Sequence, residues 1–431
     1  MSWLTLLLLL LFILFAFLVP GLWIAIALGV AGLIGILISG RFNLLDSVAN
    51  ISWNTGNDFI LTAIPLFLLM GEVILASGLS KGFYQAIAKW MRPIPGGLLH
   101  SNIMASAVFS AISGSSVATA AGIGSVAIPE MKKYGYKREH IYGSLAAGGT
   151  LGILIPPSIV LIIYGAMVDE SIVKLFMAAM IPGILLVVLF LIYTSLLTLK
   201  KSNRGLSNEI EDVSFVQSLK GVLPLFLLIV VILGSLYSGK ITPTESAGVG
   251  VFLAIIIGYI FGDFSMGKLL LAAKNAVKTT SMLIFIMIGA QIFSFAIVTL
   301  GVNREITSWL TGMELSPLVL LVIVCAIYIV LGFFMDGPAM MFLTLPLLFP
   351  VIVHAGFDPV WFGVVLVILV ELGQITPPMG LNIFVIKSID KTSKISEIVR
   401  GSIPYVFIML IAIILLTLFP EIALWLPSAS K

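Results

Sequence analysis

The chain has 431 residues, of which 60% are hydrophobic and only 10% are charged, and its mean hydropathy is +1.19. A soluble protein of this length could not bury so much apolar surface, so the composition indicates an all-α membrane protein that crosses the bilayer many times. The net charge of +3 does not indicate nucleic-acid binding, and the single cysteine, Cys325, excludes an internal disulfide.

Ten apolar runs have roughly the length that a helix needs to cross a bilayer. They lie at about 3–19, 22–39, 59–79, 143–167, 175–199, 221–237, 246–262, 279–300, 361–386 and 402–420. The first run lacks the basic start and the cleavage site of a signal peptide, so we assign it as a membrane helix. Two more apolar stretches, 93–130 and 317–352, are interrupted by "SGSS" at 113–116 and "MDGPAM" at 335–340.

The stretch 93–130 is predicted to be a re-entrant hairpin, because basic residues mark cytoplasmic loops and flank it on both sides. The flanking residues are Lys81, Lys89 and Arg92 before it, and Lys132, Lys133, Lys137 and Arg138 after it. A stretch that starts and ends inside must enter and return, with "SGSS" near its tip. The alternative is one ordinary span over 103–129, which would leave one basic cluster outside.

Counting crossings from this hairpin places every basic loop inside, including Lys200, Lys201 and Arg204. The stretch 317–352, flanked by Glu314 and Asp358, then becomes a second hairpin that opens outward. Both chain termini fall outside, the N-terminus on the condition that the short "LVPGL" turn at 18–22 separates two spans.

The polar segment 200–220 separates two similar halves, because Ser115 to Pro156 covers 41 residues and Gly337 to Pro377 covers 40. Two halves with oppositely directed hairpins form an inverted-topology repeat. The predicted parts are scaffold and a first arm helix at 1–58, half of a transport core at 59–170, scaffold with a second arm helix at 171–278, the other core half at 279–386, and a last scaffold helix at 387–431. The arm helices are expected at 41–58 and 263–278.

A Pro-Pro pair interrupts two spans, in "GTLGILIPPSIV" at 149–160 and "ELGQITPPMGLN" at 371–382. Proline has no N–H, so the carbonyl four residues earlier loses its helical donor. The carbonyls freed in this way belong to Gly152, Ile153, Gly373 and Gln374. Unpaired backbone groups are tolerated at membrane depth only where they are buried in protein or line a cavity.

Freed oxygens suit Na⁺, and the helix N-termini after each break suit an anion. The predicted hairpin tips add hydroxyls and one carboxylate, from Ser113, Ser115, Ser116 and Asp336. We therefore expect two cation sites on either side of one substrate site.

Each feature also has a plainer interpretation. A Pro-Pro pair can simply kink a helix, although two breaks at matched spacing favour a site. The run "GSSVATAAG" at 114–122 also suits close helix packing. Glu72 and Glu371 are intramembrane acids with a functional interpretation, but Glu72 could instead pair with a basic group near a partner helix. "TPTE" at 242–245 is typical of a helix capping box.

Several long stretches resemble the large membrane subunit, M, of tripartite ATP-independent periplasmic (TRAP) transporters, and the similarity covers nearly the whole chain. The stretches are "SGSSVATAAGIGSVAIPEMKKYGY", "GGTLGILIPPSIVLIIYG", "TPTESAGVGVF", "MDGPAMMFLTLPLLFPV" and "GFDPVWFGVVLVILVELGQITPPMGLNIFVIK". The resemblance implies Na⁺-driven uptake of an organic acid anion, such as a C4-dicarboxylate or sialic acid. It also implies an elevator-type fold related to the divalent-anion/Na⁺ symporters.

The resemblance further implies two protein partners. A periplasmic substrate-binding protein would deliver the ligand, and a small four-helix membrane subunit, Q, would pack against M. We expect Q to be a separate chain, because this sequence begins directly at the first M helix. Na⁺ is the expected coupling ion.

The same resemblance assigns residues to three sites. One Na⁺ site would use Ser113, Ser115, Gly152, Ile155 and Pro157. The second Na⁺ site would use Asp336, Gly337, Gly373, Thr376 and Pro378. The substrate would lie between them, near Ser116, Gln374 and Asn382.

The expected mechanism is an elevator, with a moving core of roughly 60–170 and 279–386. A self-sufficient Na⁺/anion symporter of the same architecture is the alternative. A membrane-embedded enzyme is disfavoured, because it would need acids, histidines or a metal site at one membrane face, whereas the polar groups here are mid-membrane amides, hydroxyls and carbonyls. The sequence also has no P-loop and no hydrolase, zinc-protease or dinucleotide motif. His100, His140 and His354 also lack the spacing of a transition-metal site.

Overall fold

The structure, a computed structural model, describes residues 3–91, 93–94, 96–199, 215–313, 315–378 and 380–429. Every regular element within these ranges is a helix, as the composition predicts. Eight of the described helical segments are long and apolar enough to cross a membrane, and five shorter apolar helices accompany them. Some flanking residues used for the topology, Arg92, Lys200, Lys201, Arg204 and Glu314, lie outside the described ranges, as does most of the 200–220 segment.

The first half of the chain begins with two separate helices joined at "LVPGL", residues 18–22, as the sequence predicts. The elements are α1 (Trp3–Leu18), α2 (Ile24–Ile38), η1 (Phe42–Leu44), α3 (Leu45–Gly56), η2 (Phe59–Thr62), α4 (Ala63–Ala76), α5 (Leu79–Met91), α6 (Leu98–Ser113), α7 (Ser116–Lys133), α8 (Arg138–Leu154), α9 (Ile159–Val168) and α10 (Ile172–Leu199).

The second half repeats the order of short helix, helix pair, interrupted helix and long helix that α5 to α10 show. Its elements are α11 (Phe215–Tyr237), α12 (Pro243–Phe261), α13 (Met266–Thr299), α14 (Val302–Gly312), α15 (Pro317–Leu331), α16 (Gly337–His354), α17 (Pro359–Ile375), α18 (Leu381–Ile389), α19 (Ile395–Leu418) and α20 (Glu421–Ala429). The short helices α5, α14 and α20 were not predicted.

One difference from the sequence prediction concerns the second arm. Residues 263–278 do not form a separate helix, because α13 continues unbroken for 34 residues. Its sequence contains no proline, and the hydroxyl of Ser265 caps its first turn. The first arm is a separate helix, since Asn57 and Asp58 interrupt the path from α3 to α4.

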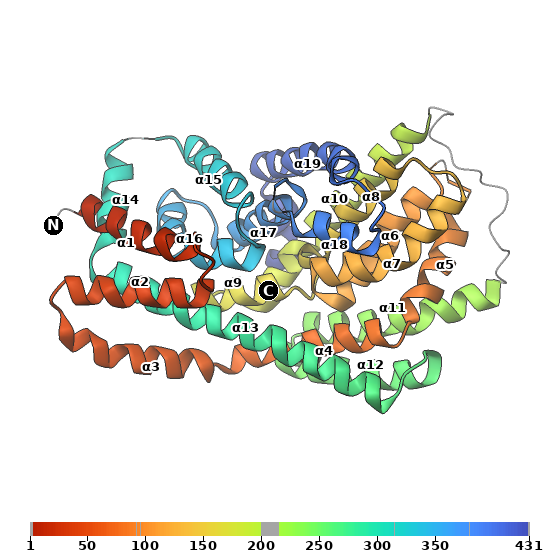
Figure 1. The fold of residues 1–431 in the computed structure, drawn as a ribbon, viewed down its shortest axis with the longest axis horizontal. Helices are drawn as coiled ribbons and strands as arrows, with labels where there is room; N and C mark the ends of the chain where they lie inside the picture. The colour runs from red at the N-terminus through yellow and green to blue at the C-terminus, as the bar shows by residue number, and fades with distance from the viewer. Residues whose placement is uncertain are drawn as a thin grey trace.

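Long helices form a layer in which α13 packs along α2, α3 and α4 (Figure 1). Glycines allow the backbones to touch, because a Cβ on Gly289 would lie 2.2 Å from the carbonyl oxygen of Ala25. In the same layer the amide of Asn275 on α13 donates to the carboxylate of Glu72 on α4, at 2.9 Å. Glu72 therefore contacts a neighbouring helix, but through an amide and not through the basic group that its plainer interpretation predicts.

The helices α6 and α7 pack antiparallel. Next to the turn, the hydroxyls of Ser113 and Thr119 are 2.7 Å apart, and farther from it the amide of Asn102 lies 3.1 Å from the sulfur of Met131. Gly114 ends α6 with a φ of +57°, a conformation that favours glycine. The stretch 103–129 is therefore two helices and not one continuous span.

The helices α15 and α16 form the matching pair in the second half. The hydroxyls of Tyr328 and Thr344, at equal distances along the chain from Asp336, hydrogen-bond across the pair. Residues 332–336 connect the two helices. Whether either pair enters and leaves the membrane on one side stays a prediction.

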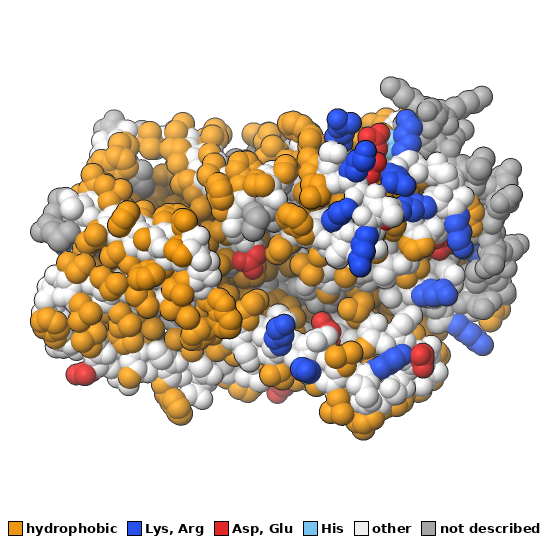
Figure 2. Space-filling view, in the orientation of Figure 1, with side chains coloured by type: hydrophobic (Ala, Val, Ile, Leu, Met, Phe, Trp, Pro, Cys, Tyr) orange, Lys and Arg blue, Asp and Glu red, His pale blue; other side chains and the backbone are white. Residues whose placement is uncertain are grey.

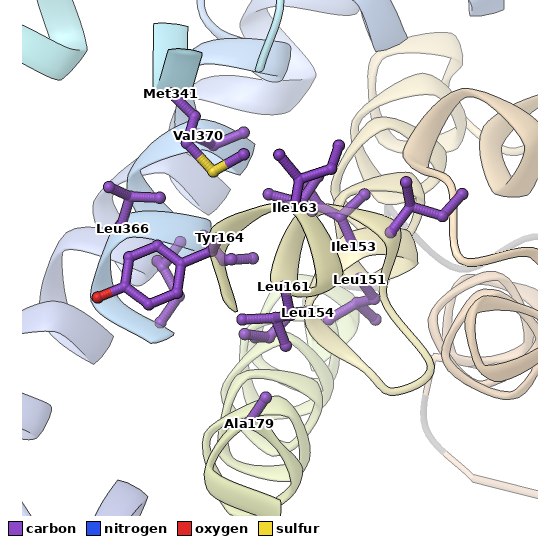
Figure 3. Packing of buried hydrophobic residues seen from close by; sticks show 14 of the residues in the cluster. Leu151, Ile153, Leu154, Leu161, Ile163, Tyr164, Ala179, Met341, Leu366 and Val370 are labelled. Carbon is purple, nitrogen blue, oxygen red and sulfur yellow. The ribbon is translucent and has the colours of Figure 1, made fainter. Parts of the chain in front are cut away.

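Helices of the two halves also pack around one apolar core. Figure 3 shows Leu151 and Leu154 of α8 and Leu161 of α9 beside α10, with Leu366 and Val370 of α17 nearby. Nearer the start of α8, a Cβ on Gly143 would lie 2.1 Å from the carbonyl oxygen of Gly401 on α19. This contact needs glycine on both helices, so α8 and α19 pack backbone to backbone.

Lysine and arginine side chains gather on one part of the surface, over α5 to α8 and α18, whereas the part over α1 and α2 is mainly hydrophobic (Figure 2). Contacts between helix ends agree with the predicted order of crossings. For example, the indole of Trp361 donates to the carbonyl of Leu416 at 2.9 Å, and both ends are predicted to lie outside. The absolute orientation stays a prediction from charge.

Candidate functional site

The first interruption separates α8 from α9 at residues 155–158, and its Pro156–Pro157 peptide is cis. Ser158 repairs part of the lost hydrogen bonding, because its hydroxyl donates to the carbonyl of Ile153 and accepts from the N–H of Leu161 at 3.2 Å. The carbonyl of Gly152 loses its helical donor to Pro156 and has no such repair from Ser158.

The second interruption separates α17 from α18 at residues 376–380, and its Pro377–Pro378 peptide is also cis. Thr376 pairs a carbonyl at the end of α17, next to this break. Its hydroxyl donates to the carbonyl of Leu372 at 2.5 Å, and its N–H reaches the carbonyl of Gly373 only at 3.4 Å. Both predicted helix breaks are therefore confirmed as interruptions of helical structure.

The turn between α6 and α7 lies directly against the first break. A Cβ on Gly152 would lie 2.5 Å from the carbonyl oxygen of Ser115, and a Cβ on Gly114 would lie 3.1 Å from the carbonyl oxygen of Pro157. Ser113 is buried beside them, with its hydroxyl 3.2 Å from the Ser115 carbonyl. Four predicted residues, Ser113, Ser115, Gly152 and Pro157, thus come together, and Ile155 lies within the same break.

The connection between α15 and α16 lies against the second interrupted helix in the same way. A Cβ on Gly332 would lie 2.6 Å from the Cα of Gly373, and a Cβ on Gly337 would lie 3.2 Å from the amide nitrogen of Gln374. Asp336 precedes α16 without capping it through its side chain. The structure therefore places Gly373 against Gly332 and Gly337 against Gln374, with Asp336 and Thr376 as the sequence neighbours of this contact. Pro378 is exposed at the end of the break.

A polar contact joins the two halves between these breaks. The amide nitrogen of Asn382 donates to the hydroxyl of Ser116 at 3.2 Å and to the carbonyl of Ala146 at 3.3 Å. Ser116 in turn donates to the carbonyl of Gly149 at 2.9 Å. Two of the three predicted substrate residues are therefore in direct contact, and Gln374 lies instead beside Gly337.

Buried acceptor atoms without a hydrogen-bond partner cluster on the second interrupted helix. Among the described residues they include Oε1 of Gln374, Oδ1 of Asn382 and both carboxyl oxygens of Glu371. Glu371 is fully buried. A buried polar atom normally has a partner, so unsatisfied oxygens at an interrupted helix are consistent with a site that takes up a ligand.

Sequence reasoning missed several polar residues near the site. Thr119 meets Ser113 one turn into α7, which its place just after "SGSS" could have indicated. The Asn102 side chain accepts a hydrogen bond from the Tyr84 hydroxyl and donates one to the Ser144 hydroxyl, each at 2.8 Å. No local sequence motif predicts this network. The described residues contain no cluster of three or more metal-ligating side chains.

The family model described as "Tripartite ATP-independent periplasmic transporter, DctM component" matches residues 11–422. The chain belongs to this family. It is 33% identical over 406 residues to the C4-dicarboxylate TRAP transporter large permease protein DctM of Pseudomonas aeruginosa, covering 93% of this chain and 94% of the relative. The TRAP resemblance inferred from the sequence is thus confirmed.

A second relative bears on the partner prediction. The chain is 32% identical over 410 residues to the isethionate TRAP transporter permease protein DctMQ of Oleidesulfovibrio alaskensis, covering 95% of this chain but 64% of the relative. Near-equal identity to permeases named for a dicarboxylate and for isethionate means that overall identity does not select a substrate. A DctMQ relative also means that a separate Q chain stays a proposal.

The fold resembles that of a solved transporter. The crystal structure of the Alcanivorax borkumensis YdaH transporter matches with a TM-score of 0.56 at 14% identity, covering 91% of this chain and 90% of that one. At this identity the match concerns the fold alone. It supports the all-helical transporter architecture that the sequence predicts.

The contact between turn and break can be tested with a methyl group. Gly152→Ala should lower the thermal stability of the purified protein, because its Cβ would collide with the Ser115 carbonyl, and overpacking of this kind costs about 1–3 kcal/mol. Gly248→Ala on α12 is the matched control, since no atom lies within 4 Å of its Cβ position. Equal melting temperatures for Gly152→Ala and the parent protein would contradict the contact.

Proposed function

We propose that this TRAP large permease takes up an organic acid anion, of the C4-dicarboxylate or sialic acid type, and that Na⁺ drives the uptake. The observation that carries the proposal is the pair of interrupted helices, each packed against the turn of a helix pair. This arrangement gathers carbonyls, hydroxyls and one carboxylate at two related places inside a membrane transporter.

Na⁺ coordination is proposed at both breaks, because oxygens of unwound backbone are common Na⁺ ligands in transporters with broken helices. The first site would use oxygens of Ser113, Ser115, Gly152, Ile155 and Pro157. The second would use oxygens of Asp336, Gly337, Gly373, Thr376 and Pro378. Support comes from the packing of Gly152 on Ser115 and of Gly373 on Gly332.

The substrate is proposed to bind between these places, near Ser116, Asn382 and Gln374. A side-chain amide can donate to a carboxylate through its nitrogen, and a serine hydroxyl can do the same. Helix N-termini at α7, α9 and α18 add a favourable field for an anion. In this proposal an organic acid replaces the contact between Ser116 and Asn382.

The proposal includes two protein partners. A periplasmic binding protein would supply the substrate, and the small Q subunit, as a separate chain, would pack against the long-helix layer. The protein would lie in the bacterial inner membrane with both termini outside, as the distribution of lysine and arginine predicts.

Transport is proposed to follow an elevator mechanism. The packing supports a scaffold of α1 to α4 with α11 to α13, since α13 lies along α2 and α4. It supports a moving core made of the two helix pairs and the two interrupted helices, with α10 and α19 packed against them. Compared with the ranges 60–170 and 279–386 drawn from the sequence, this core leaves out α4 and α13 and gains α10 and α19. The helices α5 and α14 would connect it to the scaffold.

Uptake into proteoliposomes tests the proposed function. We expect radiolabelled succinate or sialic acid to accumulate under an inward Na⁺ gradient when the chain is reconstituted with its small membrane subunit and its substrate-loaded binding protein. A K⁺ gradient of the same size is the control and should give no accumulation. Uptake by the chain alone would instead favour a self-sufficient symporter.

Side-chain changes at the proposed Na⁺ sites test the coupling. Ser113→Ala and Asp336→Asn should each raise the Na⁺ concentration for half-maximal uptake by about tenfold, because a charge-assisted ligand is worth roughly 1.5–3 kcal/mol. Asp169→Asn is the control, since Asp169 has a φ of +62° that asparagine tolerates and lies away from both breaks. Unchanged Na⁺ dependence in both site variants would refute these assignments.

A reversible cross-link tests the elevator. Leu75 on α4 and Gly122 on α7 are in contact, because a Cβ on Gly122 would lie 3.2 Å from a methyl carbon of Leu75. In a Cys325→Ser background, cysteines at both positions joined by a short reducible linker should stop uptake, and reduction should restore it. Single-cysteine proteins treated with the same reagent should keep transporting, and transport by the cross-linked protein would exclude movement between these helices.

A further inference from the structure

The helix α18 is held at both of its ends. At its start Asn382 contacts Ser116 at 3.2 Å. Near its end Ile389 packs on α7, because a Cβ on Gly124 would lie 3.1 Å from the Ile389 side chain. The helix has only nine residues, so a displacement at its end would be transmitted to Asn382 within about 12 Å of helix.

Asp390, the residue after α18, is the centre of a polar cluster. One of its carboxyl oxygens pairs with the ammonium of Lys132 at the end of α7 and accepts from the hydroxyl of Tyr142 on α8 at 2.5 Å. The other accepts from the N–H of Thr392 at 3.1 Å and from its hydroxyl at 2.7 Å. We call Asp390, Lys132, Tyr142 and Thr392 the Asp390 cluster.

Further hydrogen bonds hold the segment after α18 in place. The guanidinium of Arg138 at the start of α8 donates to the carbonyl of Thr392 at 3.4 Å, and the ammonium of Lys387 donates to the carbonyl of Lys391 at 2.9 Å. The cluster therefore ties three elements together, α7, α8 and the segment 390–394, across the two halves of the chain.

The Asp390 carboxylate is largely buried and depends on these contacts to stabilise its charge. Its side chain is 6% exposed, so loss of its cationic partner would leave a largely buried charge. Burial alone would raise the pKa of Asp390, but the hydrogen bonds from Lys132, Tyr142 and Thr392 outweigh it and hold the pKa below its ordinary value. A lowered pKa stabilises the folded protein at any pH above about 3.9, so the cluster persists at neutral pH.

We propose that Asp390 is a positioning residue for transport: the Asp390 cluster holds α18 against α7 and thereby keeps the contact between Ser116 and Asn382 closed. The role in transport rests on the proposed function, whereas the positioning of α18 does not. When the cluster breaks, α18 separates from α7 and the region around Ser116 opens towards the basic face of the molecule.

A thiol-labelling experiment measures this opening without any transport. In a Cys325→Ser background, Ser116→Cys places a thiol at a position that is 2% exposed. Adding Asp390→Asn should increase the rate at which a water-soluble maleimide labels this thiol by about tenfold, the factor expected for loss of one charge-assisted hydrogen bond. Tyr142→Phe, which removes one donor and leaves the ion pair, should increase the rate by a smaller factor.

Two controls separate positioning from general loosening of the fold. Asp263→Asn breaks the exposed ion pair between Asp263 and Lys268 and should leave labelling of the thiol at position 116 unchanged. In the chain with native Cys325 and Ser116, Asp390→Asn should leave the labelling rate of Cys325 on α15 unchanged. Equal labelling of the position-116 thiol with and without Asp390→Asn would overturn the proposal, as would a parallel increase at Cys325.

A transport measurement then tests the consequence of positioning. Asp390→Asn should raise the KM for uptake several-fold while the maximal rate per folded protein falls much less, because α18 no longer holds Asn382 in place. A fall in maximal rate with unchanged KM would contradict the role in transport. Absence of uptake by the parent protein would refute the proposed function and leave the labelling result standing.

Discussion

The carbonyls released at the two Pro-Pro pairs are the constraint on which the rest of the structure depends. In hydrocarbon a carbonyl without a donor is costly, so an interrupted helix must be covered by protein or must hold a ligand. Ser158 donates to one released carbonyl, that of Ile153, whereas the Thr376 N–H reaches the released carbonyl of Gly373 only at 3.4 Å. The turns after α6 and α15 cover what is left, which explains why glycines occur where they approach the breaks.

The two halves cover their helix breaks with different polar groups. At the first break the covering turn supplies serine hydroxyls, whereas at the second it supplies the carboxylate of Asp336 and a backbone shaped by Gly332 and Gly337. Among the described residues, the second interrupted helix has buried side-chain oxygens without a hydrogen-bond partner, at Glu371 and Gln374, and the first interrupted helix has none. A repeat with unequal polar groups predicts two cation sites of unequal affinity.

Contacts between residues of the first and second halves hold the core together. Asn382 on α18 reaches Ser116 on α7, Asp390 reaches Lys132 and Tyr142, and Gly401 on α19 touches α8. All of these join the first helix pair or its following helix to the end of the second half. These contacts bind the interrupted helices to each other and to their covering turns, as the proposed moving core requires.

The sequence by itself determined the local features. Proline chemistry marked both helix breaks, and the run "SGSS" at 113–116 marked a turn. Thr242 to Glu245 form the predicted capping box, with the Glu245 N–H 3.2 Å from the Thr242 hydroxyl. Matched spacing and charge also indicated the repeat, and the resemblance of several long stretches indicated the family. These features depend on a few neighbouring residues, so a linear pattern contains them.

Only the tertiary structure decided which distant groups meet. Ser116 and Asn382 are separated by 266 residues, and the contact of Gln374 with Gly337 joins two different helices. The continuity of α13 and the cluster around Asp390 were likewise not predicted. Such contacts depend on how closely helix backbones approach, and that approach is set by pairs of glycines on different helices, whose pairing no local pattern specifies.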